Sequence, residues 1–258
     1  MAHEFDGKKY EKTSKHQREW GGKLISELRL SGNERVLDLG CGDGAITAQI
    51  GELVPHGFVV GVDSSKGMIE TAAKYVRDNI EFKLMDINGM AFEEEFDLVF
   101  SNAALHWVND HEKLLTNAWK SLRNGGMVRF NFAADGNCSK LNEVLTEVMG
   151  RPEYAGYFED FEWPWFMPAL EEYEQLVEQT SFGEIRVWGE NADKHFPDVD
   201  AITGWIDQPS IVPFLACVAE EDKQGFRDAV VDRMIEDTLQ PDGTYFEMFR
   251  RINVYAKK

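Results

Sequence analysis

The sequence predicts an α/β fold built on a doubly wound, mostly parallel sheet. Short apolar runs that suit buried parallel strands alternate with segments of helical periodicity along the first half of the chain. The first run ends in a glycine-rich turn, GCGDG at residues 40–44, and an acidic residue lies at or just after the end of each of the first three runs. This alternation implies right-handed crossovers and a ligand site beside the first strand, at the carboxyl ends of the strands.

Composition limits the classes of protein and of partner. A chain of 258 residues, 43% of them apolar, is long enough for one sizeable ordered domain that spans residues 1–258. Its net charge of −19 disfavours nucleic acid and anionic membranes as partners, and no basic cluster longer than a pair offsets this charge. We expect a small-molecule partner, with the chain a monomer or a weak homodimer.

Three further features bear on the compartment. No apolar run reaches the ~18 residues of a membrane span, and the first residues, MAHEFDGKKYEK, lack the apolar core of a signal peptide. The cysteines Cys41, Cys138 and Cys217 form no C-x-x-C pair, which favours reduced thiols and no metal site. These features predict a cytoplasmic protein without a bound metal.

A helix is predicted over residues 10–30. Its apolar stripe has helical spacing and is formed by Trp20, Leu24, Ile25 and Leu28. Tyr10 and Gln17 lie on a second face of this helix. That face is either a solvated polar surface or the inner side of a lid over a bound ligand.

The first strand and its turn carry the most specific ligand signal. Residues 36–39 form an apolar run interrupted by Asp38, and a helix is predicted over residues 45–53. A glycine-rich turn between a strand and a helix presents backbone N–H groups to a ligand, and the glycines permit a tight turn and close approach of the ligand to the backbone. The pattern lacks the Lys-Ser/Thr ending of a P-loop and differs from the dinucleotide fingerprint G-x-G-x-x-G. Asp38 would repel a pyrophosphate and attract an ammonium group, which favours S-adenosylmethionine; the alternative is a plain strand–helix turn.

Acidic residues follow the next two strands. Asp63 comes after the strand at 58–62 and lies 19 residues past Gly44, near the spacing of the acid that binds a ribose diol, although it could instead cap the helix at 66–77. Asp86 follows the strand at 80–84, where it would suit the amine of an adenine. A nicotinamide dehydrogenase is the enzymatic rival, because its ribose would also use Asp63.

The fourth strand, residues 96–100, leads into the stretch SNAALHW at 101–107. A helix is predicted at 111–122, a turn at Gly125-Gly126 and a fifth strand at 127–132. Together the motifs DLGCGDG, VDSS, MDI and FSNAALHW resemble those of class I S-adenosylmethionine-dependent methyltransferases over residues 35–132. The stretch SNAALHWVNDH and the tail DGTYFEMFRRINVYAKK are similar to the trans-aconitate methyltransferase branch of small-molecule O-methyltransferases.

The resemblance implies a seven-stranded sheet in the order 3-2-1-4-5-7-6, with the last strand, at 252–256, antiparallel. It also implies S-adenosylmethionine as cofactor and a set of residues around it. This set consists of Tyr10, Gln17, Asp38, Gly40, Cys41, Gly42, Asp63, Ser64, Met68, Asp86, Ile87, Asn102 and Leu105. The N-terminal helix of the family carries an arginine where Gln17 aligns, so carboxylate recognition does not carry over at this position.

The remaining chain is expected to add to a core formed by residues 31–132, 169–190 and 249–258. Within it we predict a helix at 169–180 and a strand at 184–188. Insertions at 133–168 and 191–248 should form a mostly helical cap. The aromatic residues between 154 and 166 indicate either an insertion packed on the core or the walls of a substrate pocket, and packing is favoured.

The resemblance implies that the acceptor is a carboxylate, which is ionised at neutral pH and needs no general base. A hydroxyl or amine acceptor is the alternative and would need a base, for which His106 is the candidate. The predicted substrate residues are His106, Trp107, His195 and Arg251. His195 is implied by the resemblance to the cap of the branch, and Arg251 matches an arginine just before the last strand of the family. Arg251 would be a cation that offsets the acidic chain; Arg129 and Arg250 could serve instead. A protein that binds S-adenosylmethionine without catalysis is the alternative of another class.

Overall fold

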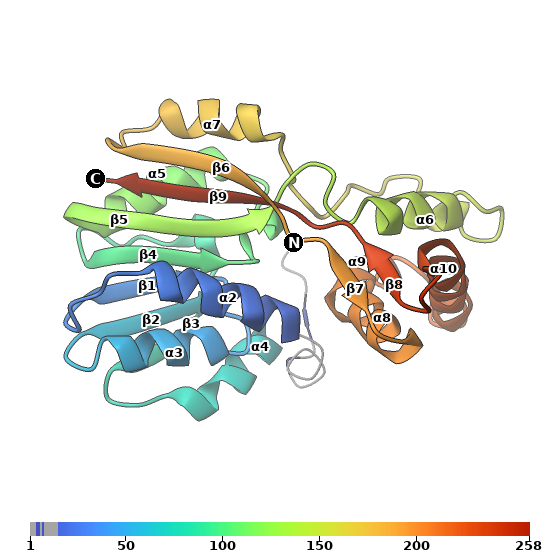
Figure 1. Cartoon of the computed structure of the whole chain (residues 1–258), viewed down its shortest axis with the longest axis horizontal. Helices are drawn as coiled ribbons and strands as arrows, with labels where there is room; N and C mark the ends of the chain where they lie inside the picture. Colours follow the sequence, from blue (N-terminus) through green and yellow to red (C-terminus); the bar gives the residue numbers. More distant parts are fainter. Residues whose placement is uncertain (1–3, 6, 8–14) are drawn as a thin grey trace. The chain divides into compact units, whose positions relative to one another are not determined.

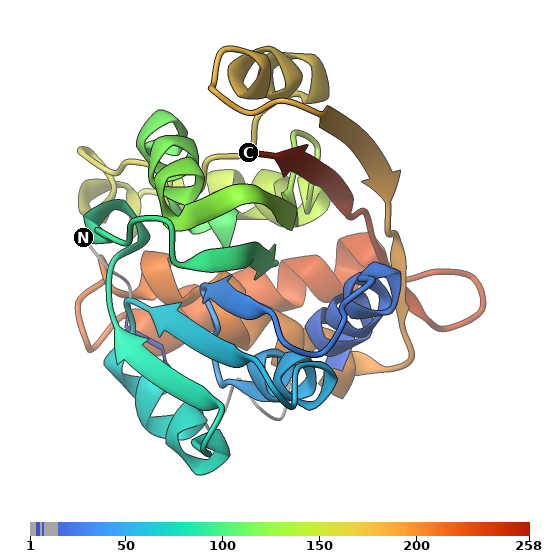
Figure 2. The same ribbon diagram turned by 90° about the vertical axis from the view of Figure 1, so that its left-hand side faces the viewer.

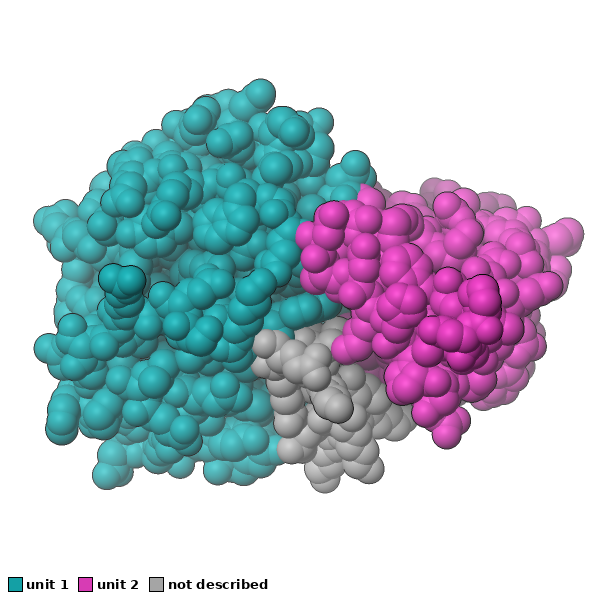
Figure 3. All heavy atoms as spheres, in the orientation of Figure 1, with its two compact units in different colours: residues 1–135, 165–190, 251–258 teal, residues 136–164, 191–250 magenta. Residues whose placement is uncertain are grey.

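The fold is that of a computed structural model, which describes residues 4, 5, 7 and 15–258; of residues 15–19 only the backbone is described. The chain divides into two compact units, coloured separately in Figure 3. The first contains residues 1–135, 165–190 and 251–258, and the second contains residues 136–164 and 191–250. No helix in the described part of the chain is long and apolar enough to cross a membrane.

The first unit is built on a sheet that has seven strands in the described residues, ordered β3-β2-β1-β4-β5-β9-β6 (Figure 1). These strands are β1 (Arg35–Leu39), β2 (Phe58–Asp63), β3 (Ile80–Leu84), β4 (Phe96–Asn102), β5 (Leu122–Ala133), β6 (Ile185–Asn191) and β9 (Arg250–Lys257). Neighbours from β3 to β5 are parallel, and β9 is antiparallel to β5. The predicted order, with the last strand of the chain antiparallel, is confirmed.

Helices lie on both faces of this sheet (Figure 2). The helices are α2 (Lys15–Glu27), α3 (Ala45–Leu53), α4 (Lys66–Ala72), α5 (His111–Ser121) and α7 (Leu170–Glu178). Single 3₁₀ turns are formed by η1 (Ala73–Tyr75), η2 (Ile87–Gly89) and η3 (Leu105–Trp107). The described part of the predicted helix at 10–30 is α2, and residues 8–14 lie outside the described residues.

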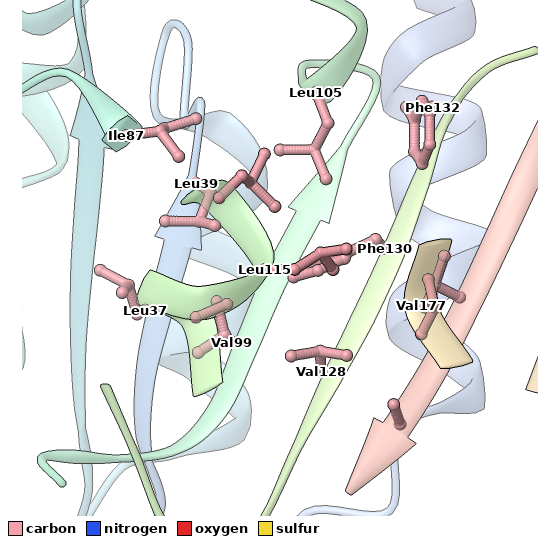
Figure 4. Close-up of a cluster of buried hydrophobic side chains, with 14 of the residues drawn as sticks. Leu37, Leu39, Ile87, Val99, Leu105, Leu115, Val128, Phe130, Phe132 and Val177 are labelled. Carbon is pink, nitrogen blue, oxygen red and sulfur yellow. The ribbon is translucent and has the colours of Figure 1, made fainter. Parts of the chain in front are cut away.

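Two apolar cores separate the sheet from its helices. Successive strand residues point to opposite faces, so Val36 belongs to the core with Ile50 of α3, while Leu37 belongs to the core with Leu115 of α5 (Figure 4). The apolar runs read from the sequence are therefore buried on both sides, as parallel strands between helix layers require.

Two local predictions differ from the structure. The predicted turn at Gly125-Gly126 lies inside β5, which begins at Leu122 and has a register irregularity against β4 there. Gly125 has φ +82°, a conformation that glycine adopts without strain, so these residues form a bulge within the strand. The predicted helix at 66–77 ends at Ala72 and continues only as the 3₁₀ turn η1.

The second unit is mostly helical, as predicted for the two insertions. It contains α6 (Ser139–Met149), η4 (Ala155–Tyr157), α8 (Val199–Trp205), η5 (Ile206–Ser210), α9 (Val212–Leu215) and α10 (Lys223–Thr238). It also contains a sheet, two-stranded in the described residues, formed by β7 (Lys194–Phe196) and β8 (Tyr245–Glu247). This ribbon was not predicted, because strands of three residues are too short to show an alternating pattern.

Rings from the aromatic stretch pack inside the second unit. Tyr154 meets Phe226 of α10 edge to face with ring centroids 5.2 Å apart. Phe161 and Trp163 both lie against Phe214 of α9, at 5.0 and 5.5 Å. These rings therefore pack within the second unit itself, whereas the sequence predicted packing on the core.

Candidate functional site

The glycine-rich turn after β1 uses its backbone N–H groups within the fold. Gly40 and Cys41 donate to the carbonyl of Val62, at 2.8 and 3.0 Å. Gly42 donates to Oδ2 of Asp63 at 2.9 Å. The interpretation that this turn presents its N–H groups to a ligand is therefore wrong for these residues. A phosphate would need such groups, so the geometry favours a ligand without one.

Glycine is required at position 40 by the neighbouring loop. Gly40 has φ +70°, and a Cβ placed there would lie 2.2 Å from the Cβ of Ala104. The loop is held in this position because the N–H of Ala103 donates to the carbonyl of Asn131 at 2.7 Å. The SNAALHW stretch is thereby packed directly against the turn after β1.

Asp63 is fixed at the end of β2 by two backbone donors. Its Oδ2 accepts from Gly42 and its Oδ1 from Ser65, both at 2.9 Å. Burial raises the pKa of Asp63, these hydrogen bonds oppose that rise, and the negative charge of Glu4 adds to it. Each carboxylate oxygen has a second acceptor site, so Asp63 fits the role of an acceptor for a ribose diol.

Asp38 is a buried carboxylate at the end of β1. It is 2% exposed, and the hydroxyl of Thr47 donates to its Oδ2 at 2.6 Å. Burial raises its pKa to about 7, the Thr47 hydrogen bond opposes this, and the charge of Asp63 adds to it. A nearby cation would stabilise the ionised form, so the site fits the ammonium group of an amino-acid moiety.

The other predicted cofactor residues lie in several settings. Asp86 is exposed, and its Oδ1 caps η2 by accepting from the N–H of Asn88 at 2.9 Å. The rest are placed as follows: Ser64 is exposed after β2, Met68 is buried on α4, Ile87 and Leu105 have buried side chains in the core with α5, Cys41 is buried, and Asn102 ends β4. Tyr10 lies outside the described residues, and of Gln17 only the backbone in α2 is described.

Two residues near the N-terminus, Glu4 and Phe5, contact the residues that follow Asp63, and the sequence did not predict either of them. The carboxylate of Glu4 accepts from the N–H groups of Lys66 and Gly67, at 3.2 and 2.6 Å, and these bonds lower its pKa. The N–H of Phe5 donates to Oγ of Ser65 at 3.2 Å. No periodicity surrounds these residues in the sequence, so nothing there predicts their contact with α4.

The loop after β4 presents His106 and Trp107. Nδ1 of His106 is buried and has no hydrogen-bond partner in the described part of the chain. Burial is the main cause that lowers its pKa to about 3, and the positive charge of Arg251 is the next. Trp107 lies edge-on to Phe5 and Trp165, with centroids 5.3 and 5.8 Å away. His106 is therefore uncharged at neutral pH and lies near a cation.

Arg251 is that cation. It is 4% exposed on β9, and its Nε and one terminal nitrogen donate to Oδ1 of Asn131 at 2.9 and 2.6 Å. Its guanidinium also lies over the ring of Trp20, 4.6 Å from the centroid. The rival arginines bind carboxylates: Arg129 pairs with Glu27 at 2.7 Å, and Arg250 pairs with Asp193 in the second unit.

The last predicted substrate residue, His195, belongs to the second unit. It lies on the exposed face of β7, where its Nδ1 is 3.0 Å from the hydroxyl of Thr244. Its ring lies 5.0 Å from that of Phe246 on β8. Among the described residues no group of three or more histidine, cysteine or acidic side chains could hold a metal ion.

Comparison with known proteins agrees with this geometry. A model of the methyltransferase domain family matches residues 36–126. A trans-aconitate 2-methyltransferase of Deinococcus radiodurans is 30% identical over 201 residues, which are 75% of this chain and 76% of the relative. Another, from Methylobacterium radiotolerans, is 28% identical over 91% of each chain. The solved phosphoethanolamine N-methyltransferase 2 of Haemonchus contortus, bound to S-adenosylhomocysteine, superposes with a TM-score of 0.60 at 19% identity. That superposition covers 98% of this chain and 57% of the other.

Proposed function

This chain belongs to the S-adenosylmethionine-dependent methyltransferases, in the branch of the trans-aconitate methyltransferases, and we propose that it methylates a carboxylate of a small molecule. S-adenosylmethionine is its cofactor and supplies, when bound, a methyl group already activated on a sulfonium. The task of the protein is then to hold the cofactor, orient the acceptor and exclude water.

Three carboxylates at the ends of successive strands would hold the cofactor. Asp63 would accept hydrogen bonds from the ribose hydroxyls, and Asp38 would bind the ammonium group. Asp86 would accept from the adenine amine. The turn after β1 supports this assignment over a dinucleotide, because the N–H groups of Gly40, Cys41 and Gly42 donate to Val62 and Asp63 and are not available to a phosphate.

The observation that carries the choice of acceptor is a buried guanidinium, that of Arg251, whose positive charge lowers the pKa of His106. A chain with a net charge of −19 repels an anionic acceptor, so binding such an acceptor requires a local cation. Arg251 supplies a buried positive charge whose effect reaches His106. A carboxylate acceptor would form a charge-assisted pair with such a guanidinium.

His106 supports the same choice because it is a poor base. A general base works best with a pKa near the operating pH, whereas burial and Arg251 lower the pKa of His106 to about 3. A phenol or an amine would need a proton removed, and a carboxylate would not. His106 and Trp107 would therefore position the acceptor.

Methylation assays with labelled S-adenosylmethionine test the proposal. The panel contains trans-aconitate, the acceptor in the relatives' name, together with other small di- and tricarboxylates, phenols and amines. We expect a labelled product only with carboxylates, and we expect mild alkali to release the label because it is an ester. Arg251→Met should raise the acceptor's KM with little change in the affinity for S-adenosylhomocysteine. An alkali-stable product with a phenol or an amine would overturn the carboxylate assignment.

A further inference from the structure

We propose that Thr47 is a positioning residue for the cofactor, because its hydroxyl holds the Asp38 carboxylate in the orientation that binds the ammonium group of S-adenosylmethionine. This inference rests on the part of the proposed function that places this ammonium at Asp38. Thr47 lies in the first turn of α3, and its side chain is fully buried. Because α3 directly follows the glycine-rich turn, it brings Thr47 back to the end of β1.

The hydroxyl of Thr47 has a different use from that of an ordinary helical threonine. Such a threonine commonly donates to the carbonyl oxygen four residues earlier in its own helix. Thr238 of α10, which is also buried, does this and donates to Met234 at 2.6 Å. A hydroxyl has only one hydrogen to donate, and Thr47 donates it to Oδ2 of Asp38 at 2.6 Å. This hydrogen bond therefore joins α3 to β1.

The hydrogen bond from Thr47 orients the Asp38 carboxylate without neutralising it. A carboxylate is planar, so a fixed position of Oδ2 also sets the direction of Oδ1. Among the described residues no group donates a hydrogen bond to Oδ1 of Asp38, and no lysine, arginine or histidine pairs with this carboxylate. Thr47 carries no charge and leaves the negative charge of Asp38 uncompensated. The ammonium group of the cofactor would supply the opposite charge through a charge-assisted hydrogen bond.

The same hydrogen bond favours the charged form of Asp38. Burial raises the pKa of this carboxyl group, and the hydrogen bond from Thr47 opposes the rise. A donor to a carboxylate stabilises its ionised form, and only the ionised form attracts a cation. Loss of the hydroxyl should therefore weaken the contact with the ammonium group in two ways, through the orientation of Asp38 and through its charge.

The decisive variant is Thr47→Val, which keeps the shape of the side chain and removes the hydroxyl. Calorimetry compares two ligands: S-adenosylhomocysteine, and 5′-methylthioadenosine, which contains adenosine and sulfur but lacks the ammonium and carboxylate groups. We expect the Kd for S-adenosylhomocysteine to rise about tenfold, the loss typical of one hydrogen bond to a charged group, and the Kd for 5′-methylthioadenosine to change less than about twofold. An equal rise for both ligands would overturn the positioning role, because it would show that Thr47 only packs α3 against β1.

Two further variants separate positioning from packing. Thr47→Ser retains the hydroxyl, and we expect it to bind S-adenosylhomocysteine within about twofold of the wild type. Thr238→Val is the matched control, because it also removes a buried hydroxyl that donates at 2.6 Å, and it should leave both Kd values unchanged. Binding by Thr47→Ser that is as weak as binding by Thr47→Val would overturn the role of the hydroxyl.

A double-mutant comparison shows whether Thr47 acts through Asp38. In Asp38→Asn the negative charge is absent, so adding Thr47→Val should change the Kd for S-adenosylhomocysteine by less than about twofold. A further loss of about tenfold in this background would overturn the positioning role, since Thr47 would then act independently of Asp38. If Asp38→Asn weakens binding and Thr47→Val does not, only the role of Thr47 falls. Unchanged binding in Asp38→Asn would instead refute the proposed contact between Asp38 and the ammonium group.

Discussion

The hydroxyl of Tyr173 lies 2.9 Å from Nδ1 of His111, and Nε2 of the same ring lies 3.0 Å from the carbonyl oxygen of Leu105. A carbonyl can only accept, so Nε2 carries the proton and Nδ1 accepts from the phenol. His111 is 2% exposed and Tyr173 is fully buried. The imidazole is thus held neutral, in one tautomer, and ties α5 and α7 to the start of the loop that carries His106.

Stability should therefore depend on the protonation of His111. Burial lowers its pKa from 6.5 to about 4, against the opposing effect of the Leu105 carbonyl. Between these values the unfolded chain binds a proton that the folded chain does not, so stability falls as pH drops from about 6.5 to 4. A shift of this size corresponds to about 3 kcal/mol. Urea unfolding at a series of pH values should show the loss.

The variant His111→Gln isolates this effect from other titrating groups. The titration of Asp38 changes stability in the opposite direction. The pKa of Asp38 is raised in the folded chain, so between its ordinary value and about 7 the folded chain keeps a proton that the unfolded chain has lost. Both proteins share that contribution, so it cancels in the difference between them. We expect the wild type to be more stable at pH 7.5, and this advantage to shrink by about 3 kcal/mol toward pH 4. A difference that stays constant with pH would contradict the assignment.

Cofactor affinity should depend on the ionisation of Asp38. Its pKa is raised to about 7, and an ammonium group favours the ionised form. Binding should therefore release a proton, and the Kd for S-adenosylhomocysteine should rise toward tenfold per pH unit below about 7. Calorimetry between pH 7.5 and 5.5, in buffers of different ionisation enthalpy, measures both quantities. Asp38→Asn should bind more weakly and lose the pH dependence; a parallel dependence in this variant would assign the titration to another group.

Asp63 should discriminate between cofactors. Asp63→Asn removes the charge that accepts the ribose hydroxyls while keeping the size of the side chain. We expect S-adenosylhomocysteine affinity to fall by ~1–3 kcal/mol, the cost of leaving polar partners unsatisfied. The wild type should show no heat of binding with NAD. Asp97→Asn is a matched control, because Asp97 also accepts a backbone N–H, from Arg35 at 2.8 Å, but lies at the amino end of β4.

The sequence predicted those site residues whose positions follow from the order of the strands in the sheet. Asp38 and Asp63 end neighbouring parallel strands, whose carboxyl ends meet at one edge, so spacing along the chain was sufficient to bring them together. Other relationships depend on residues far apart in sequence. Asn131 meets Asn253 across 122 residues, and His111 meets Tyr173 across 62. Neither pair leaves a local pattern, because its two members are too far apart along the chain for any sequence spacing to relate them.

The last prediction concerns the chemical step. If the acceptor is a carboxylate, His106→Ala should lose activity only through positioning, by ~10–100-fold, which is less than the loss typical of a removed acid–base group. The pH–rate profile of the wild type, measured with cofactor saturating at every pH, should be flat from about pH 6 to 8. Two facts give this expectation: a carboxylic acid is already ionised there, and the pKa of His106 is lowered to about 3 by burial and by Arg251. The variant Arg251→Met removes the smaller of these two causes, the positive charge. The pKa of His106 should therefore rise in this variant, while burial, the larger cause, still keeps it below 6.5. A rate limb near pH 6.5 that disappears in His106→Ala would instead identify His106 as a base. The acceptor would then be a hydroxyl or an amine.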